Sequence, residues 1–362
     1  MNFRLATPAD DTRLRTLART TVVPGHIRVI YAREPNFFAG VSTAGGTTQV
    51  IIAEDGDRIV GQGCRTVRDL YVNGKPTPVG YLSGLRLAPE ARNRSVLARG
   101  YAFLKQLHDD GETAGYLSTI VAGNELAQTV LTSRRAGLPM YAPMGTYLTH
   151  VFPARSRPPK PRHRGTTRIV TAAEVPSDQV RTFLRHEGSR RQFFPVCPPG
   201  PRPLPAAIGA ENLLVALKDN RVVGTMGVWD RNASRQCIVE GYSPLLRTLR
   251  PCLNGLLRLR GCHGLPPPGA QIRLATAALV RVKDDNPDVL RSLLDAALAT
   301  ASARGLHQFA LGLHERDPLT DRVKSVFHIT YRSLLYVVSW DNGAFYGSVN
   351  PDPIPYLELG AL

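Results

Sequence analysis

The turn at residues 92–97 carries the side chains best suited to bind an anion. It follows a strand-like segment that ends near Leu87, and apolar residues at helical spacing begin at Leu97. Backbone N–H groups at a helix N-terminus favour phosphate, and Arg92 and Arg94 add charged donors. A phosphate-binding turn is one interpretation. An ordinary strand–helix turn with arginines on its surface is the other.

Few other residues have types and spacing that indicate chemistry. The sequence contains no C-x-x-C or H-x-x-x-H pair, no G-x-S-x-G and no Walker sequence, which argues against a zinc site, a hydrolase and a P-loop. His314 and Glu315 follow an apolar strand at 309–313. They could bind an acceptor or relay a proton, or they could cap the helix expected near Asp317. Cys64 is interpreted as a small core residue rather than a nucleophile.

The elements that would position these groups occur twice along the chain. Residues 50–61, VIIAEDGDRIVG, align without a gap on residues 213–224, LLVALKDNRVVG. Both stretches predict a buried strand, a tight polar turn and a second strand. The repetition predicts two related domains.

Further elements recur in the same order. Each half opens with a short strand and a helix start in which a threonine precedes an acid by three residues, at 7–10 and 171–174. Each half later has an amphipathic helix, and Asn286 followed by a proline marks the start of the second. Buried strands are then expected at 116–121 and 309–313, followed by a further helix and a closing strand. The fold class predicted is α/β (α+β), with a mixed central sheet flanked by helices in each domain.

The expected boundaries are a first domain at 1–152, a Pro/Arg-rich linker at 153–166 and a second domain at 167–362. Proline resists both helix and sheet, so the linker is expected to be extended. The second domain contains an insertion at about 232–270, which we expect to pack over a cleft or against the first domain.

Composition limits the class of protein. With 362 residues, 43% hydrophobic and 20% charged, the chain is expected to be globular, and no apolar run suits a membrane helix. Five irregularly spaced cysteines and an N-terminus without a signal pattern predict a cytoplasmic protein with reduced thiols. The net charge is +16, and all but six of the 45 basic residues are arginines. Because they are scattered, base composition of the gene explains them better than a polyanion partner, and no nucleic acid or membrane partner is predicted.

The order of these elements resembles the GNAT superfamily of N-acyltransferases. In that family the fourth strand ends in alternating apolar residues and a proline, and a basic Q/R-x-x-G-x-G/A turn starts the next helix, as in residues 85–97. An opening such as RLATPADD at 4–11 is also typical, as is an asparagine that begins the helix after the fifth strand, here Asn124. Longer phrases resemble a bacterial subgroup of tandem-domain members, namely residues 33–38, 78–86 and 312–319.

The resemblance implies an acyl-CoA site in the first domain, with acetyl-CoA as the default co-substrate and no metal. Backbone groups of Leu85, Arg86 and Leu87 would hold the pantetheine arm, and Asn124 would contact it. The pyrophosphate would lie on Arg92, Asn93, Arg94, Ser95, Val96 and Leu97.

Two features depart from the family pattern. Ser95 and Leu97 replace the motif glycines, which alters the geometry at the pyrophosphate. The tyrosine that often protonates the departing thiolate is missing from its usual helix; Tyr141 on the next strand could reach in as the catalytic acid, although a half-buried core tyrosine is the other interpretation. In the second half, acids at Asp284 and Asp285 stand where phosphate would sit, so that half is predicted to be degenerate.

The function predicted is N-acyl transfer to the amine of a small molecule or peptide by direct attack. Two alternatives remain open at this point: a catalytically degenerate ligand-sensing or scaffold protein, and a long-chain N-acyltransferase. The sequence does not name the acceptor, the acyl length, the general base or the oligomeric state.

Overall fold

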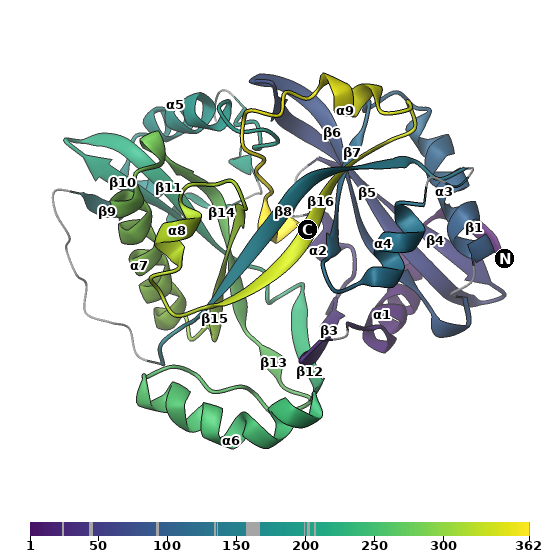
Figure 1. Cartoon of the computed structure of the whole chain (residues 1–362), viewed down its shortest axis with the longest axis horizontal. Coiled ribbons are helices and arrows are strands. Elements are labelled where there is room, and N and C mark those ends of the chain that lie inside the picture. Colours follow the sequence, from purple (N-terminus) through teal and green to yellow (C-terminus); the bar gives the residue numbers. More distant parts are fainter. Residues whose placement is uncertain are drawn as a thin grey trace.

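The computed structural model describes residues 1–23, 25–42, 46–91, 94–133, 135, 137–156, 167–198, 200, 203–205 and 208–361. Their helices and strands form a mixed α/β architecture (Figure 1). The helices are α1 (Asp11–Thr20), α2 (Ala39–Ser42), α3 (Arg94–His108), α4 (Glu125–Leu131), α5 (Ser177–Gly188), α6 (Pro244–Leu259), α7 (Pro287–Ala303), α8 (Thr320–Val323) and α9 (Ala344–Ser348).

Within the described residues, twelve strands form one continuous sheet in the order β1-β4-β5-β6-β7-β16-β8-β15-β14-β11-β10-β9. The first half supplies β1 (Asn2–Leu5), β4 (Thr47–Asp55), β5 (Arg58–Val72), β6 (Lys75–Leu87), β7 (Tyr116–Val121) and β8 (Met140–Pro153). The second half supplies β9 (Arg168–Thr171), β10 (Leu213–Lys218), β11 (Arg221–Asp230), β14 (Leu274–Val282), β15 (Gln308–His314) and β16 (Ile329–Ser339).

The two halves exchange strands at the centre of this sheet, where β8 and β16 lie side by side (Figure 1). Strand β16 of the second half pairs with β7 and β8 of the first half, and β8 pairs with β15 of the second half. Every ladder hydrogen bond across this seam therefore joins the two halves. Separating the two halves would expose strand edges in both, so the halves share one mixed sheet.

The hairpin repeat seen in the sequence is present as β4–β5 and β10–β11. Each ladder has a register shift at the equivalent position of the alignment, after Ala53 in the first hairpin and after Ala216 in the second. Because a bulge turns the strand and changes its twist, the repetition extends to local backbone geometry.

Capping groups fix the helix starts as expected. Asp10 accepts a hydrogen bond from the amide of Thr7 at 2.7 Å, and Glu174 accepts one from the amide of Thr171 at 2.8 Å. The side chain of Asn286 accepts from two amides at the start of α7. These local signals were read correctly from the sequence because each depends only on residues three or four positions apart.

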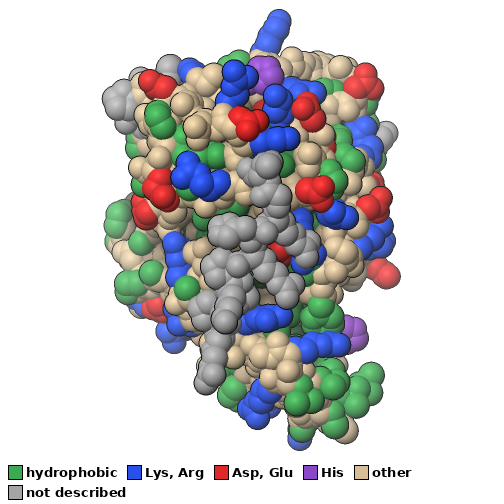
Figure 2. Space-filling model, turned by 90° about the vertical axis from the view of Figure 1, so that its left-hand side faces the viewer, with side chains coloured by type: hydrophobic (Ala, Val, Ile, Leu, Met, Phe, Trp, Pro, Cys, Tyr) green, Lys and Arg blue, Asp and Glu red, His purple; other side chains and the backbone are tan. Residues whose placement is uncertain are grey.

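The insertion of the second half contacts the first half, as predicted. It contains β12 (Gln236–Tyr242) and α6, and β12 pairs antiparallel with β3 (Ile27–Ala32). These two strands form a smaller sheet with β13 (Gln271–Ile272) and β2 (Val22–Val23). Helix α6 projects at the lower end of the molecule, where hydrophobic and basic side chains gather; elsewhere on the face in Figure 2, basic and acidic side chains are interspersed.

Candidate functional site

The first half has an opening between β6 and β7. These parallel strands pair at only three positions, from Gly80 opposite Tyr116 to Leu82 opposite Ser118. Beyond Leu82, β6 continues alone beside β5, with a register shift at Gly84, whose φ is +64°. Glycine adopts this left-handed conformation without the steric cost of a Cβ. The bulge thus leaves the β7-facing edge of residues 83–87 without a strand partner.

A cavity of about 310 Å³ fills this opening. Its walls come from β1, β4, β5, β6, β7 and β8 of the sheet and from α3 and α4, which pack on one hydrophobic cluster of that sheet. An unpaired strand edge beside an apolar cavity can hold an extended ligand that carries amide groups, by main-chain hydrogen bonds on one side and apolar contact on the other.

The structure brings most of the predicted site residues to this cavity. Those that line it are Leu85, Leu87, Val96, Leu97, Asn124 and Tyr141. Ser95 lies in the first turn of α3 with its side chain exposed. Arg92 and Asn93 lie outside the described residues, and the side chain of Arg94 is not described either, so their predicted phosphate contacts stay a prediction.

Arg86 does not line the cavity. Its Nη1 and Nη2 atoms each lie 3.4 Å from the carbonyl oxygen of Tyr31, and Nη1 also lies 3.3 Å from the carbonyl oxygen of Ala18. Only its backbone remains available for the role predicted from the sequence.

Asn124 begins α4 at the cavity wall. Its Oδ1 accepts a hydrogen bond from the amide of Ala127 at 3.2 Å. The helix cap uses only Oδ1 of the Asn124 side chain, so Nδ2 of the same side chain can donate a hydrogen bond elsewhere. Asn124 can thus cap the helix and contact a ligand at the same time.

Tyr141 is buried in the cavity wall. Its hydroxyl lies 2.6 Å from that of Tyr101, and burial raises the pKa of Tyr141 well above its ordinary value. The hydroxyl therefore stays protonated over the physiological range. It can donate a proton or a hydrogen bond, but it cannot act as a base there.

Sequence reasoning missed several lining residues, which are Gln62, Cys64, Gly84, Tyr101, Ser118 and Thr119. The glycine inside a strand pattern at 84 was the one available signal of a bulge. Burial is the main cause that raises the pKa of the Cys64 thiol, so it remains protonated and is a poor nucleophile.

The equivalent opening of the second half is filled by the chain's own tail. Strand β14 has its own left-handed residue, Leu279, with φ +49°. The Leu279 amide donates to Oε2 of Glu358 at 3.0 Å, and the amide of Val280 donates to the Tyr356 hydroxyl at 3.2 Å. In the second half, the backbone amides at this position thus already donate to side chains of the tail, whereas the corresponding edge of the first half can bind a ligand.

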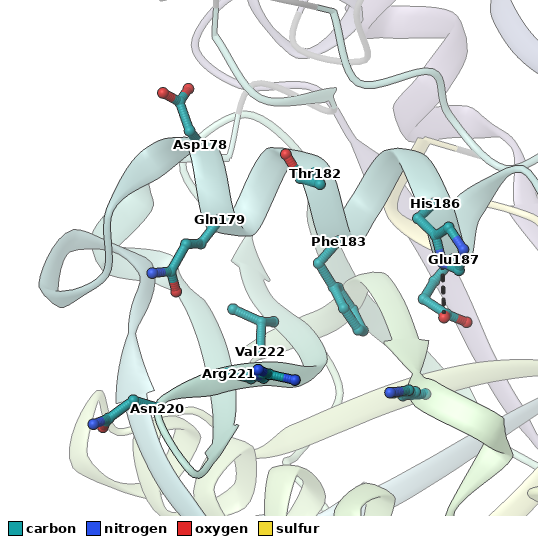
Figure 3. A pocket seen from close by; sticks show the side chains of 10 residues that line it. Asp178, Gln179, Thr182, Phe183, His186, Glu187, Asn220, Arg221 and Val222 are labelled. Atoms are coloured by element: carbon teal, nitrogen blue, oxygen red, sulfur yellow. Dashed lines mark hydrogen bonds and ion pairs between the residues drawn. The ribbon is translucent and has the colours of Figure 1, made fainter.

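A groove of about 520 Å³ lies on the outside of the second half, between α5 and the β10–β11 turn (Figure 3). Two acids line it, Asp178 and Glu187, and Glu187 lies 3.1 Å from His186 and forms ion pairs with Arg190 and Arg281. The Glu187 carboxylate is thus already paired, and Figure 3 shows Asp178 pointing away from it. The geometry favours the first-half cavity as the site.

His314 and Glu315 hold the backbone of β8. Nε2 of His314 lies 2.8 Å from the carbonyl oxygen of Met144, and Oε1 of Glu315 accepts from the amide of Thr146 at 2.9 Å. Both side chains thus contact β8 rather than the helix start near Asp317 that was expected, and these contacts argue against a proton relay.

The described residues contain no group of three or more His, Cys, Asp or Glu side chains that could hold a metal ion. In the same part of the chain, no helix is both long and apolar enough to cross a membrane. The five cysteines are free thiols.

Comparisons with known proteins give a family match for part of the chain and similar solved structures. Residues 35–122 match the family described as acetyltransferase (GNAT) domain. Saccharomyces cerevisiae N-myristoyltransferase, solved with bound myristoyl-CoA, is similar over 99% of this chain and 86% of its own, with a TM-score of 0.58 at 12% identity. A GCN5-related N-acetyltransferase from Sphaerobacter thermophilus is similar over 93% and 94%, with a TM-score of 0.50 at 13% identity. A search of curated protein sequences gave no match. At these identities the solved structures establish the fold.

Proposed function

We propose that this protein, whose residues 35–122 match the GNAT acetyltransferase domain family, transfers an acyl group from acyl-CoA to an amine. The observation that carries the proposal is the opening between β6 and β7, with its unpaired strand edge and its cavity of about 310 Å³. Acetyl is the default acyl group, and the acceptor is a small molecule or a peptide.

The residues of the opening have separate roles in this proposal. The backbone from Leu85 to Leu87 hydrogen-bonds the pantetheine arm, with Asn124 on the opposite wall. The N-terminal end of α3, from Arg92 to Leu97, binds the pyrophosphate through backbone amides and arginine side chains. The bulge at Gly84 turns strand amides toward the thioester carbonyl, where negative charge develops.

The chemical step is a direct attack. The neutral amine nitrogen forms a bond to the thioester carbonyl carbon, the carbon–sulfur bond breaks, and CoA leaves as a thiolate. The nitrogen loses one proton and the thiolate gains one, so the products are an amide and CoA thiol. Tyr141 is the proposed donor to the thiolate, and the protonated thiol of Cys64 argues against an acyl-cysteine intermediate.

The test is isothermal titration of the purified chain with acetyl-CoA and with longer acyl-CoAs. We expect binding near one site per chain that is lost in an Arg92→Glu/Arg94→Glu variant. An Arg168→Glu/Arg221→Glu variant is the matched control, since it makes the same charge change at exposed positions of the second half. Failure of every acyl-CoA to bind would refute the proposal and favour a recognition protein.

The role of Tyr141 has its own readout. Tyr141→Phe is expected to lower kcat while leaving the affinity for acetyl-CoA unchanged, because the hydroxyl acts after binding. An unchanged kcat would assign Tyr141 to the core alone.

A further inference from the structure

Gln62 of β5 lines the candidate site beside the bulge at Gly84. Its side chain is buried, with 6% of its surface exposed. Nε2 of Gln62 donates a long hydrogen bond of 3.4 Å to the carbonyl oxygen of Gly84. Oε1 of the same amide is buried and has no hydrogen-bond partner within the described residues. One atom of the amide therefore holds the bulge, and the other is an acceptor without a donor.

An acceptor of this kind is costly to a folded protein. A buried amide oxygen has given up its hydrogen bonds to water, and without a partner it gains none in return. The large majority of buried polar groups in folded proteins are hydrogen-bonded for this reason. Because Oε1 belongs to a side chain that lines a cavity, a ligand in that cavity can supply the missing donor.

The second half of the chain provides an internal comparison. The aligned hairpins place Gln62 opposite Ile52 and Thr225 opposite Val215, so Gln62 and Thr225 are equivalent positions. Thr225 is fully buried, and its Oγ1 atom donates to the carbonyl oxygen of Leu279 at 2.7 Å. Leu279 is the left-handed residue of the second half, as Gly84 is in the first. Both halves therefore hold this carbonyl with the side chain at the equivalent position.

The comparison separates the structural contact from the additional oxygen. A threonine hydroxyl is sufficient to hold the carbonyl in the second half, whose opening is filled by the tail. The first half has a longer amide, which makes the equivalent contact through Nε2 and carries Oε1 as well. The additional acceptor thus occurs only in the half whose opening forms the cavity. This difference indicates that Oε1 of Gln62 serves a ligand rather than the fold.

Gln62 belongs to the face of the sheet that lies opposite α3 and α4. Paired residues of an antiparallel ladder share a face, and Ile52, the partner of Gln62, packs in one cluster with Leu17 of α1. The next residue, Ile51, points to the other face and packs with Tyr101 of α3. The cavity is lined from both faces and therefore crosses the sheet at the bulge. Acyl-CoA held on the side of α3 and α4 leaves the α1 side for a second substrate.

We propose that Oε1 of Gln62 accepts a hydrogen bond from the acceptor amine, which enters from the α1 face of the sheet and attacks the thioester beside Gly84. This inference rests on the proposed acyl transfer. An N–H group directed at Oε1 fixes the orientation of the nitrogen, so its lone pair can be aligned with the carbonyl carbon. The bonds formed and broken are those of the acyl transfer above. Gln62 exchanges no proton, because its amide does not ionise.

Two stable CoA derivatives test this position without a known acceptor. S-carboxamidomethyl-CoA ends in a carbonyl group that carries an NH2 group, and S-acetonyl-CoA ends in the same carbonyl group with a methyl group in place of the NH2. Only the first brings an N–H donor to the far side of the carbonyl. We expect the wild type to bind the carboxamide about tenfold more tightly than the ketone, since a hydrogen bond to a buried acceptor distinguishes them. Calorimetry measures both affinities after the titration with acetyl-CoA.

Gln62→Thr gives the first half the residue that the second half has at the equivalent position. Its hydroxyl can hold the carbonyl of Gly84 as Thr225 holds that of Leu279. The variant should therefore fold and bind acetyl-CoA as the wild type does, while the preference for the carboxamide disappears. Gln179→Thr, at an exposed position of α5, is the matched control and should keep the preference.

The inference is overturned if the wild type binds the two derivatives equally, or if Gln62→Thr keeps the preference for the carboxamide. It is also overturned if acetyl-CoA binds and neither derivative does, because the site then has no room for a nitrogen beside Gln62. Loss of acetyl-CoA binding in Gln62→Thr alone would assign Gln62 to the acyl-CoA site instead. Failure of acetyl-CoA to bind the wild type is seen in the first titration, and it refutes the proposed function separately.

Discussion

Replacing Glu358 by glutamine should remove a pH dependence from the stability of this protein. The Glu358 carboxylate is buried, and burial raises its pKa from 4.5 to about 7. Oε2 accepts hydrogen bonds from the Leu279 amide and the Tyr356 hydroxyl, while Oε1 has no partner within the described residues. These contacts and nearby Arg68 only partly offset the cost of burying the charge.

The sign follows from proton linkage. The folded state binds the proton more tightly than the unfolded state does, so stability is highest below the unfolded pKa. It falls as the pH rises from 4.5 to about 7 and is constant above that. The rise in the pKa of Glu358 from 4.5 to about 7 corresponds to about 3 kcal/mol of unfolding free energy.

Glutamine keeps an oxygen that can accept the Leu279 hydrogen bond, but it does not ionise. The Glu358→Gln variant should therefore match the wild type near pH 5 and be more stable by about 3 kcal/mol near pH 8. Urea unfolding followed by tryptophan fluorescence over this range measures the difference. Other groups titrate in both proteins, so the difference between them isolates Glu358.

Glu125→Gln, at an exposed position of α4, is the control for the loss of one carboxylate. The difference in stability between Glu125→Gln and the wild type should not grow between pH 5 and pH 8. A difference between Glu358→Gln and wild type that is the same at pH 5 and pH 8 would refute the reasoning, as would a variant that is less stable at pH 8.

Two further pairs of variants test the first-half opening. Gly84→Ala places a Cβ on a residue with φ +64°, which costs about 1–2 kcal/mol and shifts the bulge amides, so acetyl-CoA affinity should fall about tenfold. Gly56 has φ +57°, and a Cβ added there would meet no atom within 4 Å. Gly56→Ala should therefore lose similar stability but keep its affinity for acetyl-CoA. Urea unfolding measures the stability of each variant, and calorimetry measures its affinity. Asn124→Ala and Asn286→Ala each remove a helix cap and should each cost about 1 kcal/mol, yet only Asn124→Ala should weaken acetyl-CoA binding. Equal affinity in both cap variants would contradict the proposed contact of Asn124.

The sequence predicted those features that depend on nearby residues. The hairpin repeat, the caps at Asn124 and Asn286, and the strand at 116–121 all arise from patterns within a dozen residues, and the structure has each of them. The resemblance to the GNAT family named Leu85, Leu87, Val96 and Leu97 as acyl-CoA contacts; the structure places them at the cavity, and the contacts themselves stay a prediction. These four residues belong to one strand–turn–helix unit.

Long-range pairing could not be predicted in the same way. Strand β16 pairs with β7 and β8, but its apolar pattern would be equally satisfied by closing the sheet of its own half. The β3–β12 ladder likewise joins the two halves, and no spacing rule connects residues in different halves.

Only part of the physical basis for the asymmetry between the halves could be predicted from the sequence. Acids at Asp284 and Asp285 argued against phosphate binding in the second half, and Asp285 in fact pairs with Arg191 at 2.6 Å. The larger effect comes from the tail, because Glu358 occupies the amide of Leu279 at the second bulge. In a duplicated fold, one tail segment that fills the opening of the second half is enough to leave a single open site in the first half. Assigning acyl-CoA to the first half is therefore the prediction that the titration tests, and a second equivalent of acetyl-CoA bound per chain would require the tail to leave its place.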